Sequence, residues 1–600
     1  MISTKNISNK TSVTDAILSG MPLDKGLWIP ENINKLDNHW IDNIDQYSVT
    51  EICYKILEVF FSKDIPKIKL QEIINKSINF DIPLHKLDTN DYILELIHGP
   101  TMAFKDFGAR IMAQIYQYFI SEKTEKYRII VATSGDTGGA VANAFSLTNV
   151  PVTIFYPKNR VSTFQEKQIT NYGKNISCFC IDGSFDDCQK IVKELLLDKD
   201  IEQEYKFITA NSINIARLIP QIFYYFISYS KLKRQYGITI NNYKLIYSVP
   251  SGNFGNVTAG FMSKLLGLPI DKLVIATNAN DSLGDFLKTG KLKTKESIDT
   301  LSNAMDVGNP SNFERLFYLC NNDIDVLKKY ILTQTINDLE TESTIKYVFN
   351  KYKYLLDPHT AVGYKSINNL EKLDNTIKVT LATASPYKFK NLVENSIKET
   401  LDYPKNFKET LNLKSLYLKY HSNNKNIFKR LIKQKIIILI GMPGSGKSTI
   451  AESLSKIFDW NLIETDNLII NKFNKKLVDI VSELKDKFTE EETKVILDIK
   501  NLKHKTVVST GGSVVYSLKA MEYLSKIGII IHLDSNFDDI VCRVKNYFER
   551  GIVIKENETF LDLFNNRKPL YEKYRNLSIN NSQLNINETT NIINNLLVDI

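Results

Sequence analysis

Short apolar runs alternate with stretches of helical periodicity over the first part of the chain, up to about residue 403. The runs that predict buried strands are residues 128–133, 152–156, 245–249 and 378–383. Amphipathic stretches such as 109–121 and 216–230 lie between them and predict helices. Because strands and helices alternate, the pattern predicts parallel α/β architecture.

A change of pattern marks a second α/β unit. Residues 404–434 are rich in Lys and Asn, contain no glycine and show no strand-like run, which predicts a partly helical connector. At Lys435 an apolar strand begins abruptly and leads into a glycine loop and a helix. We therefore expect an N-terminal region (1–90), a large α/β region (91–403), a connector (404–434) and a second α/β domain (435–600).

Composition narrows the class of protein. The 600 residues are 43% hydrophobic and 24% charged, which is typical of a globular protein. A net charge of +8 on this length is too weak to indicate nucleic-acid binding, and no apolar run approaches the roughly 20 residues of a membrane helix. Six scattered cysteines and an N-terminus without an apolar signal segment favour a cytoplasmic enzyme. The oligomeric state stays open.

A phosphate-binding loop follows the strand at 436–440. The sequence GMPGSGKS fits the pattern GxxxxGK[ST], with the required strand before it and helical residues 449–458 after it. The glycines let backbone N–H groups converge on phosphate oxygens, Lys447 supplies a point charge, and Ser448 would hold Mg²⁺. The predicted nucleotide-binding residues of this loop are Gly441, Gly444, Ser445, Gly446, Lys447, Ser448 and Thr449.

Three further motifs give residues 435–600 a resemblance to the shikimate kinase family, whose fold is the parallel P-loop nucleoside-monophosphate-kinase type. They are LIETDNLI (462–469), STGGSVV (509–515) and NRKPLYEKY (566–574). The resemblance implies that ATP and Mg²⁺ are used, that Asp466 orients the acceptor hydroxyl, and that Arg567 holds a substrate carboxylate. It further implies a substrate turn at Gly511 and Gly512, nucleotide contacts from Arg543 and Arg550, and a metal role for Glu464 beside Ser448.

The acceptor is open, because one arginine of this resemblance is missing. FTEEE (488–492) stands where the family usually has Phe-Arg, so that Thr489 replaces a carboxylate-binding guanidinium. Lys487 could compensate only as a point charge, and the glutamate run is either a solvated helix face or part of the site. A non-catalytic nucleotide-binding module is the remaining alternative.

The first unit has a candidate cofactor lysine in the turn HGPTMAFKDF. Lys105 lies between a strand and a helix and is flanked by Phe104 and Phe107, which favours a desolvated, neutral amine able to form a Schiff base. A lysine at such a position is more often a surface residue. Two glycine-rich turns, TSGDTGG (133–139) and PSGNFGN (250–256), follow predicted strands and suit anions. The combination is the layout of a pyridoxal-phosphate enzyme of the tryptophan synthase β fold, fold type II.

Ordered motifs over about residues 12–389 resemble the threonine synthase family, among them HGPTMAFKDFGAR, TSGDTGGA, YPKNRVSTFQEKQ, NSINIARLIPQ, PSGNFGN and LATASPYKF. The resemblance implies that Lys105 carries pyridoxal phosphate and moves protons while O-phosphohomoserine and water become threonine and phosphate. Ser385 stands where the family commonly has His. The implied cofactor-binding residues are Ser251, Gly252, Asn253, Phe254, Gly255, Asn256 and Thr383. The implied substrate-binding residues are Ser134, Asp136 and Thr137, with Lys158, Arg160, Asn214 and Arg217 for the substrate phosphate.

Fusion to such an enzyme bears on the acceptor of the kinase unit. Phosphorylation of homoserine would let one chain perform two consecutive steps, and the loss of an arginine at Thr489 leaves Arg567 for a single carboxylate. Acidic residues nearby could meet an amino group. We therefore expect homoserine, with shikimate as the alternative.

Overall fold

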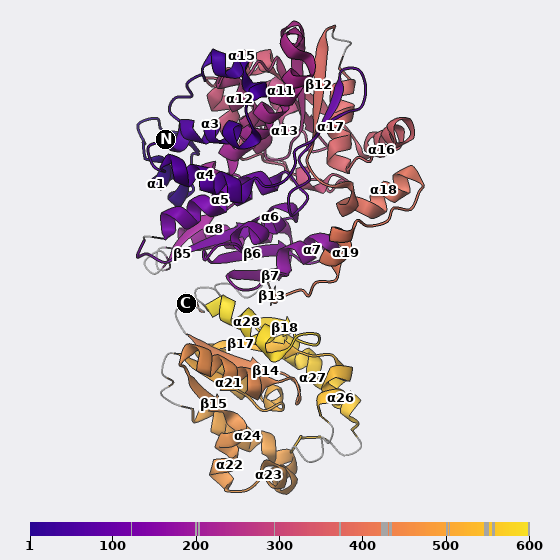
Figure 1. Ribbon diagram of the computed structural model, residues 1–600. Helices are drawn as coiled ribbons and strands as arrows, with labels where there is room; N and C mark the ends of the chain where they lie inside the picture. The colour runs from indigo at the N-terminus through magenta and orange to yellow at the C-terminus, as the bar shows by residue number, and fades with distance from the viewer. Residues whose placement is uncertain are drawn as a thin grey trace. The chain divides into compact units, whose positions relative to one another are not determined.

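The computed structural model (Figure 1) describes residues 1–121, 123–198, 201, 205–292, 295–370, 374–421, 430, 435–499, 502, 505–544, 551–554 and 558–597. It divides into two units. Unit 1 comprises Met1–Val152, Val161–Ile169 and Phe207–Leu413, and unit 2 comprises Thr153–Arg160, Thr170–Lys206 and Lys414–Ile600.

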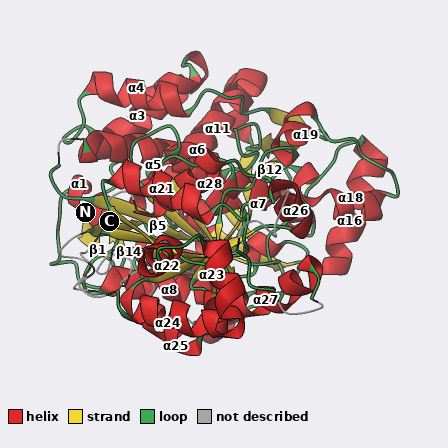
Figure 2. Cartoon of the chain, turned by 90° about the horizontal axis from the view of Figure 1, so that it is seen from below, coloured by secondary structure: helices red, strands yellow, loops and turns green. Residues whose placement is uncertain are grey.

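Unit 1 is organised around a six-stranded sheet in the order β11-β10-β9-β12-β4-β3. Its strands are β11 (Ile331–Thr335), β10 (Lys272–Thr277), β9 (Lys244–Pro250), β12 (Thr376–Ala382), β4 (Asp91–Glu95) and β3 (Leu84–Lys86). All pair in parallel except β3, as expected for apolar runs joined by helices. Helix α17 (Pro358–Asn368) packs across β9, β10 and β12. Figure 2 shows strands in yellow flanked by helices in red.

The remaining strands of unit 1 are β1 (Ile2–Ser3), β2 (Trp28–Ile29), β5 (Tyr127–Ala132) and, at its boundary, β8 (Lys206–Thr209). Its helices are α1 (Val13–Ser19), α2 (Asn38–Asp42), α3 (Val49–Phe61), α4 (Lys67–Ser77), α5 (Lys105–Ile120), α6 (Asp136–Phe145), α7 (Thr163–Thr170), α10 (Ile215–Leu218), α11 (Phe223–Tyr236), α12 (Gly255–Leu265), α13 (Ser282–Thr289), α14 (Phe313–Leu319), α15 (Ile324–Tyr330), α16 (Asp338–Tyr352), α17, α18 (Lys390–Ile397) and α19 (Lys405–Leu411). The structure divides the single helix predicted over 216–230 into α10, a 3₁₀ turn (Ile219–Ile222) and α11. The α-helical hydrogen bonding is interrupted in this turn because Pro220 has no N–H to donate.

Unit 2 is a sheet in the order β15-β16-β14-β17-β18-β13-β7-β6. Its strands are β15 (Asn461–Glu464), β16 (Thr506–Ser509), β14 (Ile436–Ile440), β17 (Ile529–Asp534), β18 (Leu577–Asn580), β13 (Leu418–His421), β7 (Ile176–Asp182) and β6 (Val152–Pro157). Its helices are α8 (Phe185–Leu197), α21 (Lys447–Phe458), α22 (Thr465–Phe473), α23 (Leu477–Leu484), α24 (Phe488–Leu497), α25 (Leu518–Ile527), α26 (Phe537–Arg543), α27 (Phe560–Tyr574) and α28 (Ile586–Leu597).

The connector prediction was wrong in one respect. Helix α19 confirms its helical part, but β13 is a strand within the predicted linker, paired in parallel with β7 and antiparallel with β18. Leu418 and Tyr420 are buried on either side of the less buried Lys419, which is the period of a strand. The surrounding Lys and Asn residues masked this short alternation. Residues 422–429 and 431–434 of the connector lie outside the described residues.

No helix in the described part of the chain combines the length and the apolar content that crossing a membrane requires.

Arg315 in α14 joins the N-terminal segment to the loop that precedes α10. Its fully buried guanidinium donates to the carbonyls of Trp28 (2.9 Å) and Ile213 (2.6 Å) and to Oδ1 of Asn312 (2.8 Å). The N–H of Asn312 in turn donates to the Asn253 carbonyl at 3.1 Å. Removing the guanidinium would therefore leave several buried acceptors without a donor.

We expect Arg315→Met to destabilise unit 1 by at least about 2 kcal/mol, because each buried acceptor left unpaired costs about 1–3 kcal/mol. Arg234→Met is the matched control, since Arg234 also donates to two backbone carbonyls but is exposed to solvent. Thermal unfolding of both variants measures the difference. Equal shifts of the unfolding midpoint would contradict this role.

Candidate active sites

The lysine turn is held against the segment that follows β12. Lys105 is the first residue of α5, and the N–H of Phe104 donates to the Thr383 carbonyl at 3.0 Å. One step further on, the N–H of Ser385 donates to the Met102 carbonyl at 3.0 Å. Since β4 and β12 are parallel neighbours, their carboxyl ends bring Lys105 and Thr383 together.

The charged side chains of Asp136 and Lys388 act on the Lys105 amine. Burial lowers the pKa of Lys105 to about 8, although Asp136 opposes this shift. Burial also disfavours the charge on Asp136, but Lys388 and Lys105 outweigh it and hold the pKa of that carboxyl well below its usual range. Lys388 has a fully buried side chain and donates to Oδ1 of Asp136 at 2.8 Å, and Gln165 donates to the same oxygen at 3.1 Å. The lowered pKa gives Lys105 a larger fraction of neutral amine near neutral pH than a solvent-exposed lysine has.

Sequence reasoning missed Lys388. It lies in the motif SPYKF, just after the carboxyl end of β12, and its side chain is buried. The available sequence signal was a lysine flanked by the apolar residues Pro386, Tyr387 and Phe389. Only the fold brings it to Asp136, which lies 252 positions away in the chain.

The TSGDTGG turn is shaped by its first residue. The Thr133 hydroxyl accepts hydrogen bonds from the N–H groups of Gly135 (3.0 Å) and Gly138 (2.8 Å). Gly135 has φ 139°, and a Cβ there would lie 2.6 Å from the Gln165 amide, so that glycine is required. The turn opens α6 and places half-buried Ser134 and Thr137 on either side of Asp136; their contacts with substrate stay predictions.

The PSGNFGN turn opens α12 and presents the unpaired N–H groups of a helix N-terminus. Phe254 has the left-handed φ of 59°, which turns the chain into the helix. A Cβ on Gly252 would lie 2.9 Å from the Met305 Cα and 3.0 Å from the Ala304 carbonyl oxygen. Because both contacts are with backbone, no larger residue fits, and the turn suits a phosphate group.

Side chains of the same turn support this fit. Oδ1 of Asn256 accepts from the hydroxyls of Tyr224 (2.7 Å) and Tyr225 (2.9 Å), while its buried Nδ2 has no partner among the described residues. Asn253 accepts from the Ser311 N–H and hydroxyl. The remaining predicted cofactor ligands of the turn are Ser251, whose hydroxyl donates to the Val249 carbonyl at 2.8 Å, and Gly255, the first residue of α12. Together with Lys105, the turn fits a phosphate-bearing aldehyde cofactor.

The four predicted ligands of the substrate phosphate differ in their surroundings. Asn214 caps α10, and its buried amide is fully engaged with protein groups, so it has no donor left for a ligand. Arg217 is buried, which lowers its pKa to about 10, and its Nε has no partner among the described residues. Lys158 and Arg160 belong to unit 2, where Lys158 Nζ lies 3.9 Å from Asp182. Arg217 is therefore the best-supported phosphate ligand of unit 1.

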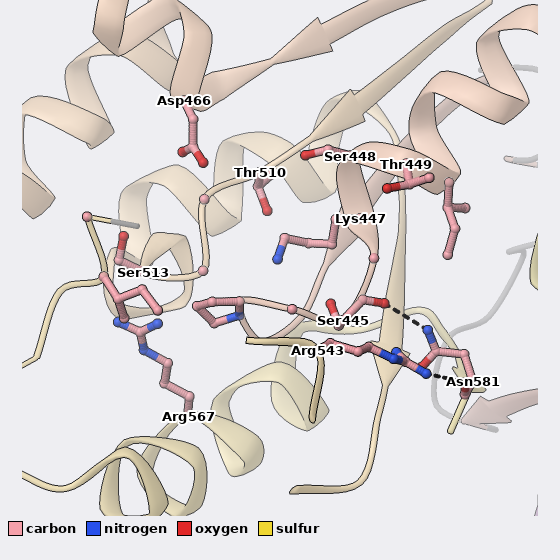
Figure 3. Close-up of a pocket in the computed structure, with 18 of the residues that line it drawn as sticks. Ser445, Lys447, Ser448, Thr449, Asp466, Thr510, Ser513, Arg543, Arg567 and Asn581 are labelled. Atoms are coloured by element: carbon pink, nitrogen blue, oxygen red, sulfur yellow. Dashed lines mark hydrogen bonds between the residues drawn. The ribbon is translucent and has the colours of Figure 1, made fainter. Parts of the chain in front are cut away.

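A cavity of about 640 Å³ in unit 2 brings most of the predicted kinase residues together (Figure 3). Its lining includes Gly444, Ser445, Gly446, Lys447, Ser448, Thr449, Asp466, Gly511, Gly512, Arg543 and Arg567. Figure 3 shows Asp466, Lys447 and Arg567 pointing toward the same space, with Arg543 and Asn581 at the other end. Arg550 lies outside the described residues.

The phosphate loop has the backbone that its glycines predict. Gly441, Gly444 and Gly446 have φ values of 152°, 85° and 92°, and a Cβ on Gly444 would lie 2.3 Å from a Val544 methyl group. Lys447 begins α21, donates to the carbonyls of Gly441 (2.9 Å) and Met442 (3.0 Å), and has its pKa lowered to about 8 by burial. The buried charge needs an anion, which the β- and γ-phosphates of a nucleotide would supply.

Polar side chains beside the phosphate loop are candidates for contacts with a nucleotide and a metal. The buried Ser445 hydroxyl has no partner among the described residues, while its carbonyl accepts from Asn581 at 2.8 Å. Ser448 Oγ lies 3.4 Å from Ser509 Oγ, and Glu464 accepts from Asn467 at 2.8 Å. The part of the chain that the structure describes contains no cluster of three His, Cys, Asp or Glu side chains able to hold a metal by themselves. A metal at Ser448 and Glu464 stays a prediction.

The acceptor end of the cavity contains a buried guanidinium and a buried carboxyl group. Arg567 donates to the Tyr516 hydroxyl (3.3 Å) and the Val553 carbonyl (2.8 Å) and stacks on the Tyr516 ring at 5.2 Å. These partners are neutral, so its charge is available to an anion. Burial raises the pKa of Asp466, although Lys447 opposes this shift.

The glutamate run of α24 divides between solvent and protein. Glu490 is exposed, and Glu491 pairs with Lys472 (2.8 Å) and Lys494 (2.6 Å) on the surface. Glu492 is only 1% exposed; its Oε2 accepts from the Ser513 hydroxyl at 2.8 Å, and its Oε1 has no partner among the described residues. Burial raises the pKa of Glu492 to about 7. The solvated-face interpretation therefore holds for two of the three glutamates.

Comparison with known proteins finds family models that match both parts of the chain. The family models "Threonine synthase N terminus", "Pyridoxal-phosphate dependent enzyme", "Threonine synthase, C-terminal" and "Shikimate kinase" match residues 1–78, 81–382, 360–432 and 443–597. The chain is 39% identical to the threonine synthase of Buchnera aphidicola (Acyrthosiphon pisum) over 414 residues, which cover 68% of this chain and 94% of that protein. It is 38% identical to the Escherichia coli enzyme over 410 residues, covering 68% and 94%.

Solved structures give the same result. The crystal structure of Escherichia coli threonine synthase is similar with a TM-score of 0.65 and 37% identity, covering 70% of this chain and 96% of that one. Pyridoxal-phosphate-bound threonine synthase from Brucella melitensis is similar with a TM-score of 0.66 and 31% identity, covering 70% and 96%. The predicted fold class is confirmed: a fold type II pyridoxal-phosphate region is followed by a shikimate kinase-like α/β domain.

Lys105→Ala should abolish covalent attachment of pyridoxal phosphate and the visible absorbance that accompanies it, because no other amine would occupy this position. Lys264→Ala is the control, since burial also lowers the pKa of Lys264 but it lies at the far end of α12. Borohydride fixation followed by peptide mapping identifies the attached lysine, and a label on Lys388 or Lys158 would contradict the assignment. The attachment rate should rise with pH to about 8 and then level, because the neutral amine reacts.

Proposed function

Because the chain belongs to the threonine synthase family, we propose that its pyridoxal-phosphate site converts O-phospho-L-homoserine and water into L-threonine and phosphate. The observation that carries this proposal is the buried Lys105, whose pKa is lowered by burial to about 8, in the same unit as two glycine-rich helix N-termini that suit anions. A buried Arg217 nearby in the fold of unit 1 is suited to a second phosphate group, which a dehydratase of serine or threonine would not need.

Residues of the chain have separate roles in this proposed reaction. When bound, pyridoxal phosphate supplies an electron sink for negative charge that develops beside the substrate amine. The turn from Ser251 to Asn256 would hold the cofactor phosphate, and the Thr383 hydroxyl would be the partner of the pyridine nitrogen. Lys105 takes the α-proton of the substrate at Nζ and later returns a proton. The TSGDTGG turn binds the substrate carboxylate through its helix N-terminus.

Lys388 would keep this site electrostatically balanced. By donating directly to Asp136, it satisfies the buried carboxylate without consuming the Lys105 amine. If Lys105 were the only cation near Asp136, the pair would favour a protonated Lys105 and would slow proton abstraction.

For unit 2 we propose an ATP- and Mg²⁺-dependent small-molecule kinase that phosphorylates the hydroxyl of homoserine. Lys447 would bind the β- and γ-phosphates, Ser448 and Glu464 the metal, and Asp466 the acceptor hydroxyl. Arg567 alone would bind the acceptor carboxylate, because Thr489 offers no guanidinium. The product would be the substrate of the pyridoxal-phosphate site, which supports homoserine.

Shikimate is the second candidate acceptor. The match of residues 443–597 to the shikimate kinase family model supports it, and Asp466, Gly511, Gly512 and Arg567 all line the cavity. A non-catalytic nucleotide-binding module is less well supported, because the cavity retains the lysine and the hydroxyl of the phosphate loop.

Lys447→Ala should abolish phosphoryl transfer, because the ammonium group that neutralises charge on the β- and γ-phosphates is lost. Threonine formation from added O-phosphohomoserine should persist, since the lysine of the other site is untouched. Lys456→Ala is the control, because Lys456 is an exposed lysine of the same helix that pairs with Glu452 on the surface. Loss of both activities in a chain that still melts cooperatively would refute two independent sites.

The ratio of kcat/KM for L-homoserine and shikimate, measured with ATP under one set of conditions, decides the acceptor. We expect homoserine to be preferred, and Thr489→Arg to shift the ratio toward shikimate by about 10- to 100-fold, because a charge-assisted pair contributes about 1.5–3 kcal/mol. Thr493→Arg, one turn further along α24, controls for an added charge. Homoserine turnover at or below the shikimate rate would refute the proposal.

A further inference from the structure

Glu492 is a buried carboxyl group for which its own helix provides no cation. The positions one turn before and one turn after it on α24 are Phe488, Thr489, Val495 and Ile496. No ion pair of Glu492 within 4.0 Å is present among the described residues, and its Oε1 is buried without a partner. A buried carboxylate in this state is unfavourable, so a ligand that brings a cation to it would be stabilised.

Oε1 of Glu492 and Oδ1 of Asp466 both lie close to Gly511, a glycine of the cavity wall. A Cβ placed on Gly511 would lie 2.4 Å from Glu492 Oε1 and 2.9 Å from Asp466 Oδ1. Gly511 and Asp466 both line the cavity, at the end where Figure 3 shows Asp466 and Arg567. Two acidic oxygens on different helices, so close together beside a residue without a side chain, suit a compact group with several donors, such as an ammonium.

The two cations of this end of the cavity have other partners. Lys447 donates to carbonyls of the phosphate loop, and Arg567 donates to the Tyr516 hydroxyl and the Val553 carbonyl. Both act on Glu492 only over a longer range. Lys447 is thus suited to the nucleotide phosphates and Arg567 to a carboxylate, and a cation for Glu492 would have to come from the ligand.

We infer that Glu492 binds an ammonium group of the phosphoryl acceptor, beside Asp466, which takes the acceptor hydroxyl. The acceptor class is then a short hydroxyl-bearing amino acid, with its ammonium at Glu492 and its carboxylate at Arg567. This inference rests on the proposed kinase function of unit 2. An acceptor that lacks the amine, such as a hydroxylated carboxylic acid, would leave Glu492 Oε1 unpaired.

The test compares two acceptors that differ only in the amine, L-homoserine and 4-hydroxybutyrate, with the full chain and ATP. In the unsubstituted chain, kcat/KM should be higher for homoserine. Glu492→Gln keeps the shape and the hydrogen bond to Ser513 but removes the charge. It should lower kcat/KM for homoserine by about 10- to 100-fold, mainly through KM, and leave 4-hydroxybutyrate unchanged or improved. Glu491→Gln removes the same charge from the surface of α24 and should change neither.

The outcomes separate this inference from the function on which it rests. If homoserine is phosphorylated but Glu492→Gln affects both acceptors alike, or neither, the ammonium site is refuted and the kinase proposal stands. If homoserine is not phosphorylated, the kinase proposal fails, and calorimetric binding of the two acceptors in the presence of ADP tests the site alone. Equal affinities, or a preference for homoserine that Glu492→Gln preserves, would refute it. ADP binding by each variant verifies that the cavity is folded.

Discussion

Each site contains a buried lysine at the first residue of a helix. Both burial and the helix N-terminus disfavour the positive charge of that lysine. Lys105 begins α5 and Lys447 begins α21, and burial lowers the pKa of each to about 8. The partial positive charge of a helix N-terminus also opposes an ammonium group there. In each case a carboxylate from another element opposes this pKa shift in part, Asp136 for Lys105 and Asp466 for Lys447. The fold must therefore bring distant strand ends together before either lysine is tolerated.

The two sites use this constraint for opposite purposes. In unit 1 the Asp136 charge is bound by Lys388, so that Lys105 can be neutral and reactive. In unit 2 Lys447 donates only to backbone carbonyls, and its charge is kept for a nucleotide. In unit 1, where a nucleophilic amine is needed, Lys388 is the counter-ion of Asp136, so that Lys105 need not pair with that carboxylate. In unit 2, where a positive charge is needed, the counter-ion of Lys447 would be the phosphates of a bound nucleotide.

Local sequence patterns predicted the elements whose chemistry is local. The strand expected at 436–440 is β14 (Ile436–Ile440), and the glycine loops lie where their motifs placed them, since both depend on neighbouring residues. Lys388 could not be placed because its partner is 252 positions away. β13 was missed because its pairing with β7 and β18, and not its composition, makes it a strand.

The three glutamates of α24 also show what the sequence alone cannot predict, here within one helical turn. Successive residues of an α-helix point about 100° apart, so that three consecutive glutamates cannot share one environment. The sequence does not show which of them faces the core; the packing of α24 against α22 and α25 decides it.

A single position on that helix decides which ligand the buried Glu492 suits. Thr489 lies one turn before Glu492, where an arginine could pair with the carboxylate and also present a guanidinium to the ligand. With threonine there, the fold is undisturbed, because the Thr489 carbonyl still accepts from the Thr493 hydroxyl within the helix. The acceptor end of the cavity instead retains the guanidinium of Arg567, and beside it the carboxyl group of Glu492 has no counter-ion among the described residues. An acceptor that is itself a zwitterion satisfies both, whereas an acceptor with only a carboxylate satisfies one and leaves the other buried and unpaired.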